Sequence, residues 1–191
     1  AEELGKKFSE LSMIVVHLGS GISVGRFEDG KLIDVNNTTD EGPFTPDRTG
    51  DLPVRDVVEM AYSGKYDKQE MKRMFVGRGG LIAYLGTNDL RRALKMGESD
   101  PKALEVVEAM AYQVAQEIGG LCAVMKGKVD AIVFTGGMAY SETFINMIKS
   151  YVYKFAPIFV VPGEMEMEAL AYGALRVASG QEPAKTWSDD E

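Results

Sequence analysis

Hydrophobic and polar positions change their spacing along the chain, which predicts strands first, helices in the middle and alternating helices and strands at the end. Three short apolar or alternating runs open the pattern and predict strands over residues 13–18, 22–28 and 31–36. Asp29-Gly30, between the second and third runs, is typical of a tight hairpin turn. We therefore expect these strands to form an antiparallel meander.

The middle of the chain has apolar residues at i, i+3 and i+4, the spacing of one helix face. Helices are expected over residues 54–62, 68–75, 89–95 and 101–125. Asp100 is placed to cap the last of these, and Pro101 takes its first position. Met110, Cys122 and Met125 fall in its apolar pattern, so we expect packed side chains there rather than ligands or a reactive thiol.

Beyond residue 125 the pattern becomes α/β. Strands are expected over residues 131–134 and 158–161, and helices over residues 143–153 and 165–178. A meander followed by helix-strand-helix-strand-helix is the order of a ribonuclease-H-like domain, a mixed sheet with helices on its faces. The sequence thus predicts one α/β domain over residues 1–180, with a helical insertion, and a polar tail over residues 181–191.

The two ends of the chain give weaker signals. Leu4, Phe8 and Leu11 keep helical spacing without an N-cap, which indicates the last turns of a helix that begins before Ala1. A processed initiator methionine would also explain Ala1. In the tail, Trp187 is expected to be a docked or idle surface aromatic.

Composition and charge narrow the classes of partner. A hydrophobic content of 45% suffices for a sizeable core, and a net charge of −8 argues against nucleic acid, which needs clustered Lys and Arg. We see no signal peptide and no apolar run near the ~20 residues of a membrane span, so the cytoplasm is expected. The single cysteine excludes an internal disulfide, and the single histidine excludes a multi-histidine metal site.

A glycine turn, Gly19-Ser20-Gly21, follows His17-Leu18 at the end of the first strand. Main-chain N–H groups in such a turn can point at one spot and bind an anion, typically phosphate. A dinucleotide fingerprint is disfavoured, because that motif must open a helix and a strand is expected here. Two alternatives stay open: a plain hairpin whose glycines only supply positive φ, and a core role for His17.

A second glycine pair, Gly136-Gly137, ends the strand predicted over residues 131–134. Glycine there lets the backbone approach a flat ligand such as adenosine. Alone this signal is weak, because strands often end in glycine. Its value is that the two glycine turns could flank one nucleotide.

Arg48 lies between Pro46 and Gly50 in a loop over residues 36–53. Long loops in compact domains are more often functional than accidental. A preorganised guanidinium can stabilise the charge on a transferring phosphoryl group. The alternative is an arginine paired with Asp47 or Asp51 that only braces the loop.

Two charged clusters stand at predicted helix starts. Asp89-Leu90-Arg91 begins one helix, and Glu164, Glu166 and Glu168 surround the start of another. Taken alone, an aspartate there is usually a cap, and glutamates usually suit the helix dipole.

Together these motifs resemble the acetate/butyrate kinase family, in the acetate and sugar kinase–Hsp70–actin superfamily. HLGSGIS is similar to the family's phosphate loop, TPDRTGD to the segment with its catalytic arginine, DLR to a nucleotide contact, and FTGGM to its adenosine loop. Two segments, NNTTDEGPFTPDRTGDLP and PGEMEMEALAYGALR, resemble butyrate kinase sequences more closely than acetate kinase sequences. The resemblance implies a catalytic Arg48. It also implies nucleotide contacts at His17, Leu18, Gly19, Ser20, Gly21, Asp89, Leu90, Arg91, Gly136, Gly137 and Met138.

The resemblance has departures. Ala139-Tyr140-Ser141 stands where acetate kinases have Gly-Glu-Asn. The family's metal-linked glutamate maps to Glu166, with Glu164 possible. Family members have two domains, and the acid-binding residues of the first do not precede Ala1. The chain therefore resembles the second, nucleotide-binding domain, beginning inside a helix.

The implied activity is transfer of the γ-phosphoryl of ATP, with Mg²⁺, to a short-chain carboxylate, in the first place butyrate. A carboxylate is already ionised at pH 7 and needs no general base, which agrees with a single histidine. The family also implies a homodimer. The alternatives are an acetate kinase, a hydroxyl kinase such as a sugar kinase, which needs a base, and a non-catalytic ATP-binding or dimerisation module.

Overall fold

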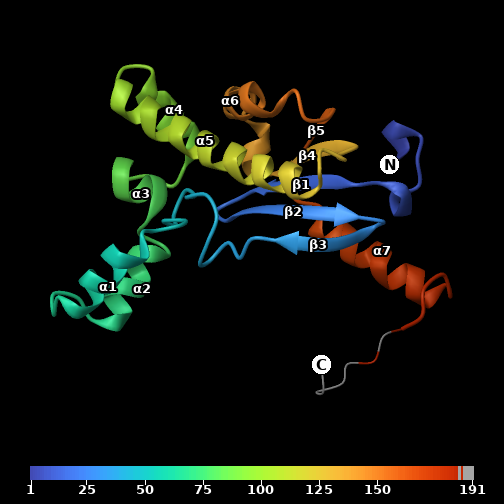
Figure 1. Cartoon of the computed structure of the whole chain (residues 1–191), viewed down its shortest axis with the longest axis horizontal. Helices are drawn as coiled ribbons and strands as arrows, with labels where there is room; N and C mark the ends of the chain where they lie inside the picture. Colours follow the sequence, from blue (N-terminus) through green and yellow to red (C-terminus); the bar gives the residue numbers. More distant parts are fainter. Residues whose placement is uncertain (185, 187–191) are drawn as a thin grey trace.

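A five-stranded mixed sheet forms the centre of the computed structural model, which describes residues 1–184 and 186. Its strands are β1 (Met13–Leu18), β2 (Ile22–Glu28), β3 (Lys31–Val35), β4 (Ala131–Gly136) and β5 (Ile158–Pro162). Their order across the sheet is β3-β2-β1-β4-β5, with β1 to β3 antiparallel and β1, β4 and β5 parallel (Figure 1). This confirms the predicted meander and mixed sheet. Residue 187 and most of the predicted tail lie outside the described residues.

The turn between β2 and β3 forms as the sequence predicts. Asp29 has a φ of 50° and Gly30 a φ of 73°, the positive φ at both central residues that a type I′ hairpin turn requires. Asparagine, aspartate and glycine tolerate this region best. A local dipeptide therefore determines how the meander folds back.

Helices α1 to α4 follow the meander, and α5 to α7 accompany the last two strands. Their bounds are α1 (Val54–Tyr62), α2 (Lys68–Phe75), α3 (Gly80–Leu85), α4 (Leu90–Gly97), α5 (Pro101–Val124), α6 (Glu142–Val152) and α7 (Glu166–Ala178). Apart from α3, each matches a predicted helix to within a few residues. The periodic pattern misses α3 because this helix has only 6 residues and begins at a glycine with positive φ.

The prediction of helical turns at the start of the chain is wrong in type. Short 3₁₀ turns at Glu2–Leu4 and Phe8–Glu10 stand there, and Gly5 ends the first with a φ of 61°. The apolar spacing still has a packing role, because Leu11 is fully buried and Leu4 packs beside it. These residues cover part of one sheet face.

Helix α5 packs with α4 and α6 on the other face of the sheet (Figure 1). Ile14, Val16 and Leu18, at every second position of β1, point to this face and pack with the buried side chains of α5 in the main core. Asp100 caps α5 by accepting a hydrogen bond of 2.9 Å from the backbone N–H of Lys102. The N-cap is therefore as predicted.

Cys122 is a packed thiol, as its place in the apolar pattern predicts. It is 4% exposed in the main core, and burial raises the pKa of its thiol. The neutral thiol is therefore favoured over the reactive thiolate. Met110 and Met125 are buried in the same cluster.

Within the described part of the chain, no helix combines the length and apolar character that crossing a membrane requires.

Candidate active site

A cavity of about 640 Å³ lies where β1 and β4 end, a size typical of small-molecule sites. Several residues singled out in the sequence line it together: Gly19, Ser20, Asp89, Leu90, Arg91, Gly137 and Met138. The two glycine turns thus meet on one cavity, although they are far apart in the sequence. They meet because β1 and β4 are adjacent parallel strands, whose carboxyl ends lie at the same edge of the sheet.

Some lining residues were not singled out as ligands: Pro46, Asn88, Tyr140 and Ser141. Ser141 caps α6 by accepting a hydrogen bond from Phe144 N–H, and Tyr140 is 71% exposed. Both come from the segment that departs from the family pattern. No local signal marks Pro46 or Asn88, since folding alone brings them to this wall.

The glycines of the first turn provide space rather than unusual backbone angles. Gly19 and Gly21 both lie outside the left-handed region of φ, which corrects the alternative that they serve positive φ. A Cβ on Gly19 would lie 3.0 Å from His17 Nε2, and one on Gly21 would lie 2.7 Å from Arg48 Nη1. Position 21 therefore needs a residue without a side chain, because the Arg48 guanidinium packs directly against its backbone.

Of the main-chain N–H groups in this turn, one already donates a hydrogen bond within the turn. Gly19 N–H donates to the carbonyl of Gly21 at 3.0 Å. Among the described residues, the N–H groups of Ser20 and Gly21 have no such acceptor. These two donors are the ones left for an anion.

His17 and Leu18 are placed differently from the glycines. Leu18 is fully buried, so only its backbone can reach a ligand. His17 is half-buried on the opposite face of β1, between Ser23 and Thr135 in the strand register. Neither residue lines the cavity.

The two glycines of the second pair, Gly136 and Gly137, have different roles. A Cβ on Gly136 would lie 2.6 Å from the carbonyl oxygen of Leu18, so this glycine allows the close approach of β4 to β1. Its N–H and C=O pair with Gly163 at 3.0 and 3.1 Å. Gly137 lines the cavity, and a Cβ there would meet no described atom within 4 Å. Gly137 is therefore open to the cavity, and its contact with a flat ligand stays a prediction.

Asp89 both caps a helix and faces the cavity. Its carboxylate accepts hydrogen bonds from the backbone N–H of Arg91 at 2.9 Å and from Arg91 Nη2 at 2.7 Å. The Arg91 guanidinium lowers the pKa of this carboxyl to about 2. Asp89 is thus ionised at neutral pH, with its charge already paired, and Arg91 is 88% exposed in its side chain.

Arg48 is held chiefly by Thr38. Arg48 Nη1 donates to the Thr38 carbonyl at 2.9 Å and to Thr38 Oγ1 at 2.7 Å. Asp47 Oδ1 lies 3.7 Å from Arg48 Nε, and neither atom has a hydrogen-bond partner among the residues that the structure describes. Asp51 instead accepts a hydrogen bond from Gly42 N–H. Of the two bracing partners considered above, only Asp47 is close, and it is not hydrogen-bonded.

Backbone hydrogen bonds from the start of α3 hold the loop that carries Arg48. Leu81 N–H donates to the carbonyl of Thr45, and Ile82 N–H to that of Pro46, each at 3.1 Å. Gly77 N–H donates to the Asp47 carbonyl at 2.7 Å. The glycines around Arg78 were the available sequence signal, because such a cluster permits this close backbone packing.

Helix α5 holds the same loop from the other side. Gln113 Oε1 accepts a hydrogen bond of 2.8 Å from Phe44 N–H. Close by, Glu117 faces Asp51 and Glu41 of the loop, and burial together with these two carboxylates raises the pKa of Glu117. The carboxylate of Glu117 on the helix is therefore repelled by the carboxylates of Asp51 and Glu41 on the loop.

Glu117→Gln is expected to raise the thermal midpoint at pH 7 by on the order of 2 °C. A pKa that is higher in the folded state means that ionised Glu117 costs stability, and this cost disappears as the pH falls through the raised pKa. The gain should therefore shrink as the pH approaches 4.5, the ordinary glutamate value. Thermal unfolding at several pH values, beside the exposed Glu108→Gln on the same helix, is the measurement. An equal gain at every pH would contradict the electrostatic cause.

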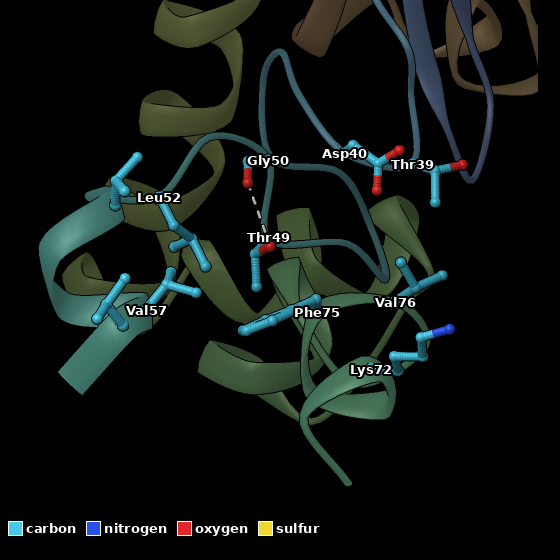
Figure 2. A pocket seen from close by; sticks show the side chains of 11 residues that line it. Thr39, Asp40, Thr49, Gly50, Leu52, Val57, Lys72, Phe75 and Val76 are labelled. Atoms are coloured by element: carbon cyan, nitrogen blue, oxygen red, sulfur yellow. Dashed lines mark hydrogen bonds between the residues drawn. The ribbon is translucent and has the colours of Figure 1, made fainter. Parts of the chain in front are cut away.

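A second cavity, of about 520 Å³, lies beside α1 and α2 (Figure 2). Leu52, Val57 and Phe75 contribute apolar walls, while Thr39 and Thr49 come from the two ends of the Arg48 loop. None of the nucleotide-binding residues proposed from the sequence lines it. It is therefore distinct from the cavity at the glycine turns.

The two candidate metal-linked glutamates lie in different places. Glu164 lines the cavity at the glycine turns, just after β5. Glu166 is the exposed first residue of α7 and is not among the lining residues. The metal role of Glu166 stays a prediction, and the geometry favours Glu164.

Comparisons with known proteins agree with this architecture. A family profile described as the acetokinase family matches residues 1–158. The chain is 57% identical over 187 residues to a probable butyrate kinase of Thermotoga petrophila, covering 98% of the chain and 52% of that relative. It is 54% identical over 188 residues to probable butyrate kinase 2 of Caldanaerobacter subterraneus subsp. tengcongensis, covering 98% and 53%.

Solved structures show the same fold. The acetate kinase of Porphyromonas gingivalis superposes with a TM-score of 0.81 at 20% identity, over 91% of this chain and 51% of that one. The acetate kinase of Entamoeba histolytica gives 0.78 at 20% identity, over 91% and 54%. The chain spans about half the length of the curated relatives it matches. It belongs to the acetokinase family.

Proposed function

We propose that this chain is the nucleotide-binding domain of an ATP-dependent carboxylate kinase, the second domain of a two-domain enzyme. Its substrates would be ATP and a short-chain carboxylate, butyrate first, and its products ADP and an acyl phosphate. One observation carries the proposal: the Arg48 guanidinium packs against the glycine turn that borders the cavity. The names and identities of the butyrate kinase relatives support the choice of acceptor.

The residues divide the work by their positions. Gly137 leaves room for the flat part of the nucleotide, and the N–H groups of Ser20 and Gly21 suit phosphate oxygens. An oxygen of the carboxylate forms a bond to the γ-phosphorus while the bond from that phosphorus to the β-phosphate oxygen breaks. Arg48 would stabilise the negative charge that spreads over the transferring group. No proton has to be removed, because the carboxylate is already ionised.

The available donors fit a magnesium ion that arrives with ATP. Mg²⁺ in phosphate-transferring enzymes is held by one or two carboxylates together with substrate phosphates. Glu164 brings one carboxylate to the cavity wall, whereas that of Asp89 is occupied by Arg91. Across the described residues, no group of three or more His, Cys, Asp or Glu could hold a metal ion. Glu164 would therefore hold the ion, which neutralises phosphate charge when bound.

The test pairs binding with turnover. The 191-residue chain is titrated with ATP and Mg²⁺ by calorimetry, and the natural polypeptide that contains this sequence is assayed for acyl phosphate with butyrate, acetate and glucose side by side. We expect ATP binding in the first experiment and acyl phosphate from butyrate in the second. Phosphorylation of glucose alone would favour a sugar kinase. ATP binding without turnover of any acceptor would favour the non-catalytic module, for which the implied homodimer would be the functional unit.

A further inference from the structure

The Arg48 guanidinium uses its nitrogens unequally. Nη1 donates to two oxygens of Thr38, at 2.9 and 2.7 Å, and the other side of this nitrogen faces Gly21. Nη2 makes no hydrogen bond to any residue within 1–184 or 186, and the buried Nε also lacks a hydrogen-bond partner there, with Asp47 Oδ1 3.7 Å away as its nearest opposite charge. One end of the guanidinium is therefore fixed while the other is left available.

Thr38 is itself tied to the strand that begins at the glycine turn. Two residues before it, the Asn36 side chain accepts a hydrogen bond of 2.7 Å from Val24 N–H and donates one of 3.0 Å to the carbonyl of Ile22. Ile22 directly follows Gly21 in the chain. The turn and the residue that holds Arg48 are thus fixed to the same end of β2.

Two acceptors on one nitrogen constrain the guanidinium more than one would. An arginine side chain has large rotational freedom, and a single acceptor leaves the planar group free to pivot. The Thr38 carbonyl and hydroxyl together, with Gly21 on the opposite side, limit this pivot. The hydroxyl is the part of this arrangement that the side chain determines and that a substitution can remove.

We propose that Thr38 is the positioning residue for Arg48. Its hydroxyl, with its own carbonyl, holds Nη1, so that Nη2 stays uncommitted for an oxygen of the transferring phosphoryl group. The catalytic consequence rests on the proposed function. The arrangement of the two side chains does not, and it can be measured separately.

The first test reads the guanidinium directly in the 191-residue chain. In ¹⁵N NMR, with the Arg48 signals assigned by their loss in Arg48→Lys, the wild type should show slowed rotation and separate Nη protons. Thr38→Val keeps the branched shape and removes the hydroxyl, so we expect faster rotation and a shifted Nη1 signal; Thr38→Ala should act alike. Thr38→Ser should retain the wild-type signals. Unchanged Arg48 signals in both Thr38→Val and Thr38→Ala would overturn the proposal.

Thr39→Val is the matched control. Thr39 is the adjacent residue, and its side chain lines the cavity of Figure 2 instead of contacting Arg48. The same chemical change one position away should therefore leave the Arg48 signals as they are. Faster rotation and a shifted Nη1 signal in Thr39→Val as well would show a general disturbance of the loop and would count against a specific role of Thr38.

The second test separates kcat from KM in the natural polypeptide that contains this sequence. Thr38→Val should lower kcat roughly 10- to 100-fold, the effect of a lost hydrogen bond to a charged group, with KM for ATP within about twofold. Thr38→Ser should recover kcat to within about threefold. A raised KM with unchanged kcat would refute positioning. Absence of acyl phosphate from the wild type would sink the proposed function, while the NMR result would still decide the role of Thr38.

Discussion

Arg48→Ala is expected to lower kcat of the natural polypeptide that contains this sequence by about 10³- to 10⁵-fold, the range for arginines that stabilise a transferring phosphoryl group. KM for ATP should change little, because Arg48 is not among the residues that line the cavity at the glycine turns, where we propose that the nucleotide binds. An interaction made mainly in the transition state affects kcat rather than ground-state binding. Steady-state kinetics of acyl phosphate formation is the measurement.

Two further variants make this result specific. Arg48→Lys keeps the charge but loses the planar fork, one nitrogen of which is held by Thr38 while Nη2 makes no hydrogen bond to a described residue, so we expect only partial recovery of kcat. Arg55→Ala removes a guanidinium whose side chain is 89% exposed on α1, and it should leave kcat unchanged. Near-normal turnover of Arg48→Ala would contradict the catalytic role.

Gly80→Ala is expected to destabilise the protein by about 3 kcal/mol or more, and about 3 kcal/mol corresponds to a fall in the thermal midpoint of roughly 6–12 °C. A Cβ on Gly80 would lie 1.8 Å from the carbonyl oxygen of Thr45 and 2.7 Å from that of Arg48. Neither atom can move without disturbing the loop that holds Arg48. Thermal unfolding and kcat should therefore both be affected, and both are measured.

Gly86→Ala, at the other end of α3, is the matched control. Gly80 and Gly86 both have positive φ, of 57° and 69°, but a Cβ on Gly86 would meet no described atom within 4 Å. Alanine there should cost only the backbone strain of about 1–2 kcal/mol, with kcat unchanged. Equal losses of stability in the two variants would show that backbone strain, not the collision with Thr45, is the cause.

Local patterns in the sequence predicted most of the secondary structure. The Asp29-Gly30 turn, the Asp100 cap of α5 and the alternation along β1 each depend on nearest neighbours, and the structure confirms all three. Helix α3 was missed because its amphipathic pattern is too short to stand out. The 3₁₀ turns before Leu11 were mistaken for a helix, because similar apolar spacing serves both.

Site residues were predictable as types of residue but not in their contacts. The glycine turn was expected to present main-chain donors, and its glycines were considered for positive φ; the structure shows instead that Gly21 makes room for Arg48. Thr38 carries no sequence signal, because a threonine in a polar loop is ordinary. Its role appears only when the loop folds back and brings it to the guanidinium.

By itself, the sequence determined most of the elements, the mixed α/β class and the motifs that resemble an acyl kinase, because these depend on local spacing and residue type. Tertiary structure alone decided which residues share the cavity, that Glu164 rather than Glu166 reaches it, and that Thr38 and Gly21 enclose one end of Arg48. The physical reason is that such contacts join residues distant in the chain. Their distances are set by strand register and backbone packing, which no local pattern encodes.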